Sequence, residues 1–469
     1  MAVPAALRPL RHKRYALIWT AGLVSNIGTW LQTVAVGSLV TGLTSNPIWT
    51  AVAYVAGFLP MSVLSPIGGA LADRFDRRRC TVAGVLIEAM LAGALAVLVA
   101  TGRTSPVVIN LLVFVAGCVS ALRMPFQQAM LPDLVPPEDL VGAVSLGSAQ
   151  WNLGRVVGPA FAGIVIVAGS FSLAFTLNAI SFLAVVLAFV FVRVPSPTTD
   201  EEWPGVIAQM KAGARAVRAE PGCRSAMVLV AVAAGIGAPF MALIAAMADE
   251  FVDGGPKRIA AATGALTTAQ GFGSVVGALM LPSLVNRFGR QRVIFGSILA
   301  MGASLVPYAL APTVAAAVPG LAVTGGIYIC VLSGLSAIVQ LRAPTEFRGR
   351  AISLFWSVMS IVFPIGAFVQ GVIARNAGMR ATTLLSAGML VVVTLVLRAL
   401  RPRTFEALDD RLELEEVEEP ERLVAEVESL VAEGDSPVTP HLGVGLLHAM
   451  VGDEEEGGVV EDAGPLDRR

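Results

Sequence analysis

Long apolar runs alternate with short charged or polar breaks along most of this chain. Each run has the ~20 residues or more that an α-helix needs to cross a bilayer. Six runs precede a polar break at residues 194–221, and six follow it, with limits near residues 15–42, 47–71, 80–101, 106–131, 140–167 and 171–193, and then near 222–248, 257–284, 291–312, 314–341, 348–374 and 378–400. The pattern predicts an all-α membrane protein with twelve transmembrane helices.

Composition supports this prediction. The chain is 55% hydrophobic and 14% charged, and its mean hydropathy is +0.74, which excludes an ordinary soluble globular protein. The first apolar run follows a basic start and is too long for the core of a signal peptide, so we expect it to remain as the first helix. The four cysteines are scattered without a paired spacing, so we expect neither a disulfide framework nor a thiolate metal site.

The loop at residues 73–79 joins the second and third runs and carries six charged side chains in seven positions. Four of them are arginines, and short loops rich in Lys and Arg face the cytoplasm. Twelve spans put both ends of the chain on one side of the membrane, and that side then holds 22 Lys and Arg residues against 5 on the other. We therefore expect a multi-pass protein of the cell membrane with both termini in the cytoplasm.

The two sets of six runs repeat one another. At an offset of 213 residues, Arg74, Phe75, Arg77 and Arg79 recur as Arg287, Phe288, Arg290 and Arg292. At an offset of 208, residues that recur include Pro136, Glu138, Gly158 and Gly163, as Pro344, Glu346, Gly366 and Gly371. A unit with an even number of spans keeps its orientation when duplicated, so the chain predicts two parallel six-helix bundles, at residues 1–193 and 222–403.

Two segments lie outside these bundles. In the link at residues 194–221, an apolar stripe of Val206, Met210 and Val217 opposes Lys211, Arg215 and Arg218, which predicts an amphipathic helix on the anionic membrane surface, with a solvated linker as the alternative. Residues 404–469 carry 20 acidic and 4 basic side chains and predict a largely disordered cytoplasmic tail. The tail is either free in solution or in contact with the basic loops.

The charged loop also carries a recognisable pattern: Gly69, Leu71, Ala72, Asp73, Arg74, Arg77 and Arg78 resemble the signature loop between helices two and three of the major facilitator superfamily. Asp76 stands where that family usually has Gly. The resemblance implies two six-helix repeats around a central substrate site, with Gly69, Asp73, Arg74, Arg77 and Arg78 as a gating motif.

A longer stretch narrows the resemblance. The Pro-rich link that starts at Arg123, followed by Asn152, Leu153, Gly154 and Arg155, is similar to the enterobactin-exporter group, also called transmembrane secretion effectors. Gly154, Gly158, Pro159 and Gly163 resemble the antiporter motif on helix five of exporters, although Ala162 replaces one expected glycine. The resemblance implies export of siderophores or drugs from the cytoplasm.

Three ionisable side chains lie inside predicted spans, where they are costly and therefore candidates for function: Glu88, Arg123 and Arg155. Glu88 lies eight residues after the start of its run and Arg123 eight before the end of the next, so both are about 12 Å deep and their pairing is geometrically allowed. The resemblance adds Asp73 as an alternative partner of Arg123. Two roles for Glu88 stay open, a proton carrier and a static partner of an arginine.

Polar side chains form stripes on three predicted helices. Thr263, Thr267, Gln270 and Ser274 share one helical face, and similar stripes comprise Asn26, Thr29, Trp30 and Thr33 in the first span and Ser353, Ser357 and Ser360 in the eleventh. Such residues also serve as contacts between helices. The resemblance places these helices around the cavity, where Arg155 is the charge expected, so a large and mainly apolar or anionic substrate fits better than a cation.

Chemistry other than transport lacks the residues it needs. His12, His441 and His448 lie outside the predicted spans, and the sequence has neither a phosphate-binding loop nor a complete dinucleotide motif. We expect no enzymatic activity, cofactor, metal or nucleic-acid partner, but a monomeric exporter that acts on a small molecule in the bilayer with protons as coupling ion. The alternatives are an uncoupled facilitator or importer of the same fold, and a non-transporting receptor or scaffold.

Overall fold

The structure is a computed structural model that describes residues 5–192, 215, 217–344 and 347–409. In these ranges, twelve helices are long and apolar enough to cross a membrane, which confirms the predicted spans. The first six are α1 (Lys13–Thr44), α2 (Pro47–Ala72), α3 (Arg77–Ala100), α4 (Pro106–Ala129), α5 (Leu140–Ala168) and α6 (Phe171–Phe191). Three short 3-10 helices, η1 (Ala5–Arg11), η2 (Leu131–Asp133) and η3 (Pro137–Asp139), lie before α1 and between α4 and α5.

The second set contains one span that is not a continuous α-helix. Span seven is divided into α8 (Pro221–Val232), a π-helical turn η4 (Ala233–Gly237), a 3-10 segment η5 (Ala238–Leu243) and α9 (Ile244–Asp249). The remaining spans are α10 (Pro256–Phe288), α11 (Arg290–Leu310), α12 (Val314–Arg342), α13 (Arg348–Ala377) and α14 (Met379–Leu400), followed by the short helix α15 (Arg403–Glu406).

Local sequence sets where the helices begin. Asn46 caps α2 by accepting a hydrogen bond from the Ile48 amide, and Pro47 occupies the first turn, where a missing amide proton costs nothing. Asp76 caps α3 by accepting from the Arg79 amide at 2.7 Å, so the charged loop reverses direction in four residues. We call the helix ends beside residues 73–76 the loop end, and the opposite ends the far end.

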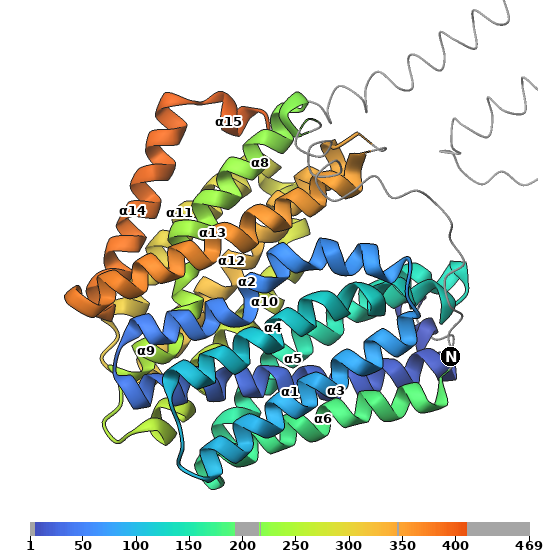
Figure 1. Cartoon of the computed structure of the whole chain (residues 1–469). Helices are drawn as coiled ribbons and strands as arrows, with labels where there is room; N and C mark the ends of the chain where they lie inside the picture. The colour runs from blue at the N-terminus through green and yellow to red at the C-terminus, as the bar shows by residue number, and fades with distance from the viewer. Residues whose placement is uncertain (1–4, 193–214, 216, 345–346, 410–469) are drawn as a thin grey trace, which may run out of the picture. The chain divides into compact units, whose positions relative to one another are not determined.

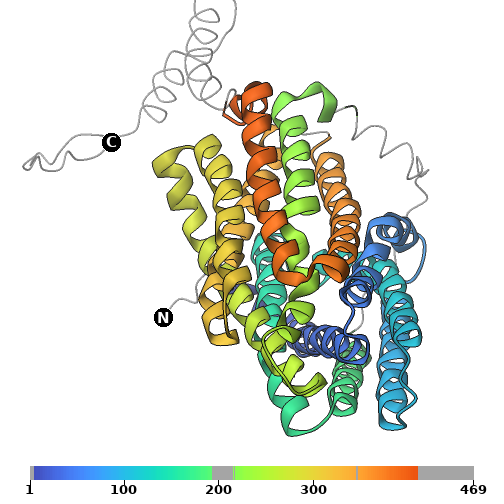
Figure 2. The same ribbon diagram turned by 90° about the vertical axis from the view of Figure 1, so that its left-hand side faces the viewer.

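The described residues form one compact unit. Helices α1 to α6 pack on one another around buried clusters that include Tyr15 and Phe189 at the loop end and Phe175 at the far end. The later spans share one larger buried cluster. The two sets meet along α2 with α13, α5 with α10, and α1 with α10 (Figures 1 and 2). The predicted boundaries of the two bundles stay predictions.

Small residues make the contacts between the two halves at the far end. A Cβ atom added to Gly264 of α10 would meet the Pro159 carbonyl of α5 at 2.6 Å, and one added to Gly37 of α1 would lie 3.5 Å from the Ala245 Cβ of α9. Lys257 also donates to the Gly169 carbonyl at 2.8 Å. Backbones approach this closely only where side chains are absent or small.

The loop end has no such closure among the described residues. Added Cβ atoms on Gly69 of α2, Gly147 of α5 and Gly349 of α13 would meet nothing within 4 Å. Ser148 and Ser353 are exposed on helices of opposite halves. The halves are therefore packed together at the far end and separated at the loop end.

Order extends beyond the predicted start of the acidic tail. We expected the tail from residue 404, but Phe405 and Leu408 are fully buried, and the Phe405 ring lies 5.2 Å from that of Phe295. Asp409 accepts hydrogen bonds from the Gln291 amide in the first turn of α11. The packed unit thus includes the residues that follow α14, and the tail proper begins later than its composition suggests.

Asp409 replaces a local cap that the second repeat lacks. Asp76 caps α3, but the position 213 residues later is Gly289, which has φ +80° and forms a one-residue connection between α10 and α11. An L-residue such as Asp is strained at that φ. The cap of α11 is therefore supplied by a residue 118 positions away in the chain.

The amphipathic helix predicted in the link at residues 194–221 lies mostly outside the described residues. Val217 is buried, and Arg215 and Arg218 are exposed. The amphipathic helix stays a prediction. Val206, Met210 and Lys211 of the same prediction lie outside the described residues, as does the tail from residue 410.

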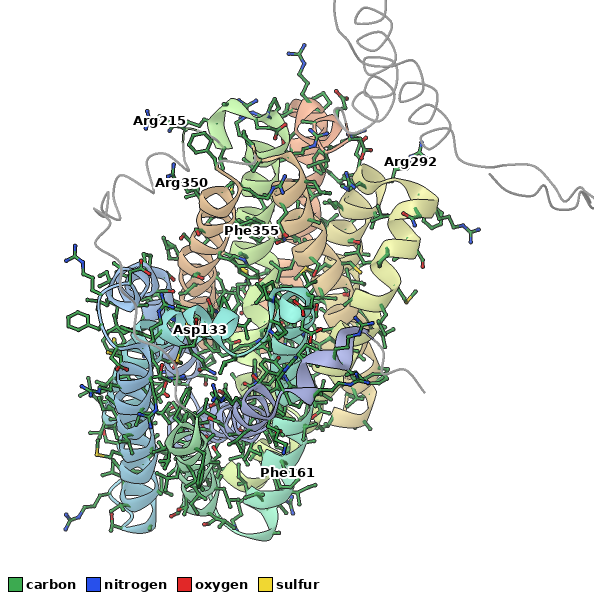
Figure 3. The ribbon with its side chains drawn as sticks, turned by 90° about the vertical axis from the view of Figure 1, so that its right-hand side faces the viewer. Asp133, Phe161, Arg215, Arg292, Arg350 and Phe355 are labelled. Atoms are coloured by element: carbon green, nitrogen blue, oxygen red, sulfur yellow. The ribbon has the colours of Figure 1, made fainter. Side chains whose placement is uncertain are left out.

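Arg215, Arg292 and Arg350 lie toward the loop end of the second half (Figure 3).

A pair of truncations tests the position of the tail boundary. Stopping the chain after Arg403 removes the buried Phe405, and loss of a buried aromatic side chain costs about 3–5 kcal/mol. We expect this protein to have a clearly lower melting temperature in detergent than the protein stopped after Asp410, which should match the full chain. Equal melting temperatures for both truncations would show that residues 404–410 do not stabilise the helical unit.

Candidate functional site: a buried arginine between the two halves

Arg155 of α5 lies at the interface of the two halves and is only 7% exposed. Its Nη2 donates to Oε1 of Gln270 on α10 at 2.9 Å and lies 3.8 Å from the Met241 sulfur in η5. Its guanidinium carbon lies 5.9 Å from the centre of the Trp30 ring on α1. One side chain thus contacts spans one, seven and eight.

Aromatic rings pack on Trp30 and between the two halves. The Trp30 ring packs edge-on against that of Trp151, and the ring of Tyr54 on α2 lies 5.5 Å from that of Phe363 on α13. The site therefore combines one cation with aromatic and apolar side chains drawn from both halves.

Hydrogen bonds through Ser274 hold the Gln270 side chain in place. Its side-chain amide donates to the Ser274 hydroxyl at 3.3 Å, and Ser274 in turn donates to the Gly325 carbonyl of α12 at 3.1 Å. Because Gln270 and Ser274 lie one turn apart, both face α12. This chain of hydrogen bonds fixes the Gln270 oxygen toward Arg155.

The break in span seven lies beside the same site. The π-helical turn and the 3-10 segment interrupt the α-helical hydrogen bonds, and Gln370 of α13 donates to the freed Ile236 carbonyl at 2.8 Å. Met241, which contacts Arg155, belongs to this irregular segment. The pattern of residues predicted an unbroken span here, although Gly235, Gly237 and Pro239 lie within five residues, a composition typical of an interrupted helix.

The structure pairs two of the three predicted intramembrane charges. Arg123 Nε lies 2.9 Å from Glu88 Oε2, and both side chains are buried, with 13% and 4% exposed. Arg123 also donates to Gln127 at 2.7 Å. Asp73, the alternative partner, is exposed and forms no ion pair with a described residue.

Two arginines of the predicted gating motif, Arg77 and Arg78, bind carbonyl groups at helix ends. Arg77 donates to the Ala72 and Ala129 carbonyls, which end α2 and α4, and lies 3.7 Å from Asp133. Arg78 donates to the Phe189 carbonyl near the end of α6. These cations stabilise the negative ends of three helix dipoles. Arg74 is exposed, and Gly69 has open space beside it.

The predicted antiporter motif lies where α5 crosses α1 and α10. A Cβ atom on Gly154 or Gly158 would collide with Asn26 or Trp30 of α1, and the Pro159 carbonyl faces Gly264 of α10. Gly163 lies near Ala261, further along the same contact. The motif therefore lets α5 pack closely against α1 within the first half and against α10 of the second half.

The polar stripes divide into residues at the site and residues used elsewhere. Gln270 and Trp30 lie at Arg155, and Ser274 supports Gln270. The others make different contacts: Asn26 donates to the Gln150 carbonyl; Thr29, Thr33, Ser353 and Ser357 donate to their own helices; Thr263 is buried, and Thr267 is half-buried. Their membership in a substrate cavity stays a prediction.

One buried ion pair was not anticipated. Glu220 caps α8, and its Oε1 lies 3.4 Å from Arg342 Nη1 at the end of α12, with 7% and 3% of the side chains exposed. Both residues lie at run ends, where charge is ordinary, so hydropathy alone carried no sign of their burial.

Fold and site together define a membrane transporter of the major facilitator superfamily. A profile of the transmembrane secretion effectors matches residues 4–431, and the chain belongs to this family. It is 25% identical over 399 residues to macrolide efflux protein A of Streptococcus pyogenes, covering 82% of this chain and 95% of that protein. It is 26% identical over 396 residues to the multidrug efflux pump Tap of Mycolicibacterium fortuitum, covering 82% and 96%.

Solved structures share the fold at low identity. A bacterial homologue of the human lysosomal transporter Spinster, inward-facing and occupied, has a TM-score of 0.67 and 14% identity, covering 86% of this chain and 99% of that one. A D-xylose-proton symporter has a TM-score of 0.64 and 13% identity, covering 83% and 98%. The chain is thus a multi-pass transporter of the plasma membrane that acts on small molecules, as the resemblance implied.

A substitution at Gly264 tests the contact between the halves. Gly264→Leu would drive a side chain into the α5 backbone near Pro159, and overpacking of this kind costs about 1–3 kcal/mol. We expect a lower melting temperature than for Gly388→Leu, the matched control on α14, where an added Cβ meets nothing within 4 Å. Equal melting temperatures would mean that this crossing is not a tight contact in solution.

Proposed function

We propose that this protein is a proton-coupled exporter of a siderophore or drug that works by alternating access, as a monomer, with the loop end and both termini in the cytoplasm. The observation that carries the proposal is the asymmetry between the two ends of the interface. Small residues close the far end around Gly37 and Gly264, while Gly69 and Gly147 at the loop end have empty space beside them.

The unfilled glycines support a second conformation. Gly69 belongs to the gating motif, yet nothing in this state requires it to lack a side chain. A glycine is needed where another backbone comes close, and rocking of the halves about the central site would bring the loop ends together. This structure then represents the state open to the cytoplasm, and Gly69 serves the opposite state.

Glu88 is the proposed proton carrier. It is the one carboxylate buried within a span of the first half as the structure describes it, about 16 Å from the start of α3 at the loop end, and its partner Arg123 also binds Gln127. Gln127 offers Arg123 a substitute acceptor when Glu88 takes up a proton. Protonation of Glu88 would thus cost less than breaking an isolated buried ion pair.

The substrate class follows from the relatives and from the site. Two relatives with similar coverage are named for efflux of macrolides and of multiple drugs. The aromatic and apolar side chains near Arg155, which include Trp30 and Met241, suit an organic substrate. Both halves of the site come from one chain, which supports a working monomer.

A disulfide across the far end tests alternating access. With the four native cysteines replaced by serine, Gly37→Cys and Ala245→Cys would place two Cβ atoms about 3.5 Å apart, within the range that disulfides span. We expect oxidation to form the bond and to stop drug accumulation in inside-out vesicles, and reduction to restore it. Each single cysteine variant is the control. Full transport with the bond formed would exclude opening at the far end.

A substitution of Glu88 tests proton coupling. Glu88→Gln should abolish accumulation that depends on a pH gradient while leaving substrate binding to the purified protein intact. Glu138→Gln, which removes an exposed carboxylate outside the spans by the same isosteric change, is the control for gradient dependence. Accumulation in Glu88→Gln that still collapses with a protonophore would leave Glu88 as a structural partner of Arg123, and accumulation insensitive to a protonophore in the native chain would favour an uncoupled facilitator.

A further inference from the structure

Arg155 is a buried cation without a negative partner in the part of the chain that the structure describes. Its contacts are an amide oxygen, a thioether sulfur and an aromatic ring, and its Nε is buried without a hydrogen-bond partner. A charge held out of water costs several kcal/mol unless it is compensated. Neutral contacts of this kind satisfy only part of that cost.

Two other buried arginines show how this protein normally compensates the charge. Arg123 and Arg342 have 13% and 3% of their side chains exposed, and each contacts a glutamate, Glu88 or Glu220. Each pair lies within a single half. Arg155 differs in that its contacts come from both halves, Trp30 from the first and Met241 and Gln270 from the second.

The surroundings of Arg155 offer further donors for one anionic group. The Trp30 indole N–H is buried and without a partner among the described residues, and the Trp30 ring lies beside the guanidinium. These donors come from α1 and α5, and no described carboxylate forms an ion pair with Arg155.

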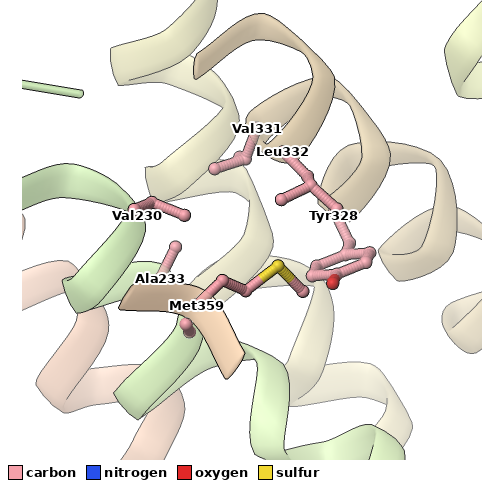
Figure 4. A pocket seen from close by; sticks show the side chains of 7 residues that line it. Val230, Ala233, Tyr328, Val331, Leu332 and Met359 are labelled. Atoms are coloured by element: carbon pink, nitrogen blue, oxygen red, sulfur yellow. The ribbon is translucent and has the colours of Figure 1, made fainter. Parts of the chain in front are cut away.

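Tyr328 lines a small apolar pocket together with Val230, Val331, Leu332 and Met359 (Figure 4). This pocket has room for about one water molecule. The apolar part of an organic ligand would therefore pack on the side chains beside Arg155 itself, which include Trp30 and Met241.

We propose that the transported molecule is an amphiphilic organic anion whose carboxylate binds Arg155 and whose apolar part packs against Trp30 and Met241 beside it. This inference rests on the proposed function and names its substrate class. A guanidinium binds a carboxylate through two parallel hydrogen bonds, and Arg155 has the unpartnered Nε for one of them. Binding also supplies the missing negative charge at the interface, so the anion holds the two halves together while it is bound.

Three naphthalene derivatives of equal size test the charge preference on the purified full chain in detergent. 2-Naphthoate carries a carboxylate, 2-naphthamide is neutral and 2-naphthylmethylamine is a cation. We expect the carboxylate alone to raise the melting temperature in a concentration-dependent manner. Equal stabilisation by the amide or the amine, or no stabilisation by the carboxylate, would overturn the proposal.

Substitutions at Arg155 assign the effect to this residue. Arg155→Gln should weaken naphthoate binding about tenfold or more, the range for a lost charge-assisted hydrogen bond, and Arg155→Lys should retain part of it. Arg103→Gln, which removes an exposed arginine, is the matched control and should bind as the native chain does. Unchanged binding in a folded Arg155→Gln protein would overturn the proposal.

Two further experiments distinguish a transported anion from a bound lipid headgroup, and distinguish the anionic substrate class from the exporter function. If phosphatidylglycerol stabilises the native chain but not Arg155→Gln, and naphthoate does neither, the site takes a lipid headgroup and the proposal fails. Inside-out vesicles that accumulate the amine but not the carboxylate would leave the exporter function standing and overturn the anionic class. Vesicles that accumulate none of the three, despite naphthoate binding at Arg155, would count against the exporter function alone.

Discussion

A guanidinium that is taken out of water must find negative charge, and the way this protein meets that requirement divides its rigid parts from its moving parts. Arg123 and Arg342 are compensated by Glu88 and Glu220, and each pair ties together helices of a single half. The third, Arg155, lies between the halves and has only neutral partners. Strong, desolvated ion pairs are expensive to separate. Keeping them inside each half lets the halves move as rigid bodies, while the interface carries a charge that a ligand can compensate.

The rest of the interface is built from weak contacts that suit repeated opening. Gly37, Gly264 and Ala245 bring backbones close, and each contact gains only dispersion energy, which is small for any one pair of atoms. Opening the far end therefore breaks many weak contacts but separates no buried ion pair. The same small residues let helices slide closely past one another.

The two repeats have kept one plan and diverged in detail. The first repeat caps α3 locally with Asp76, whereas the second has Gly289 there and takes its cap from Asp409, beyond the last span. Span one is a continuous helix, and span seven is broken by a π-helical turn and a 3-10 segment beside Arg155. Both changes introduce contacts between segments distant in the chain. The second half thus depends more on its tertiary surroundings than the first.

The sequence by itself determined the spans, their order, the charged loop and the twofold repeat, because hydropathy and charge act within one run of residues. It also made the pairing of Glu88 with Arg123 an allowed contact, because depth can be counted along two neighbouring antiparallel helices. The neighbours of Arg155, the burial of Glu220 with Arg342 and the cap from Asp409 could not be read in this way, since each joins residues more than 80 positions apart. Only the tertiary structure decided these contacts, because which faces of non-adjacent helices meet depends on how side chains pack across the whole bundle, and no local pattern of residues records it.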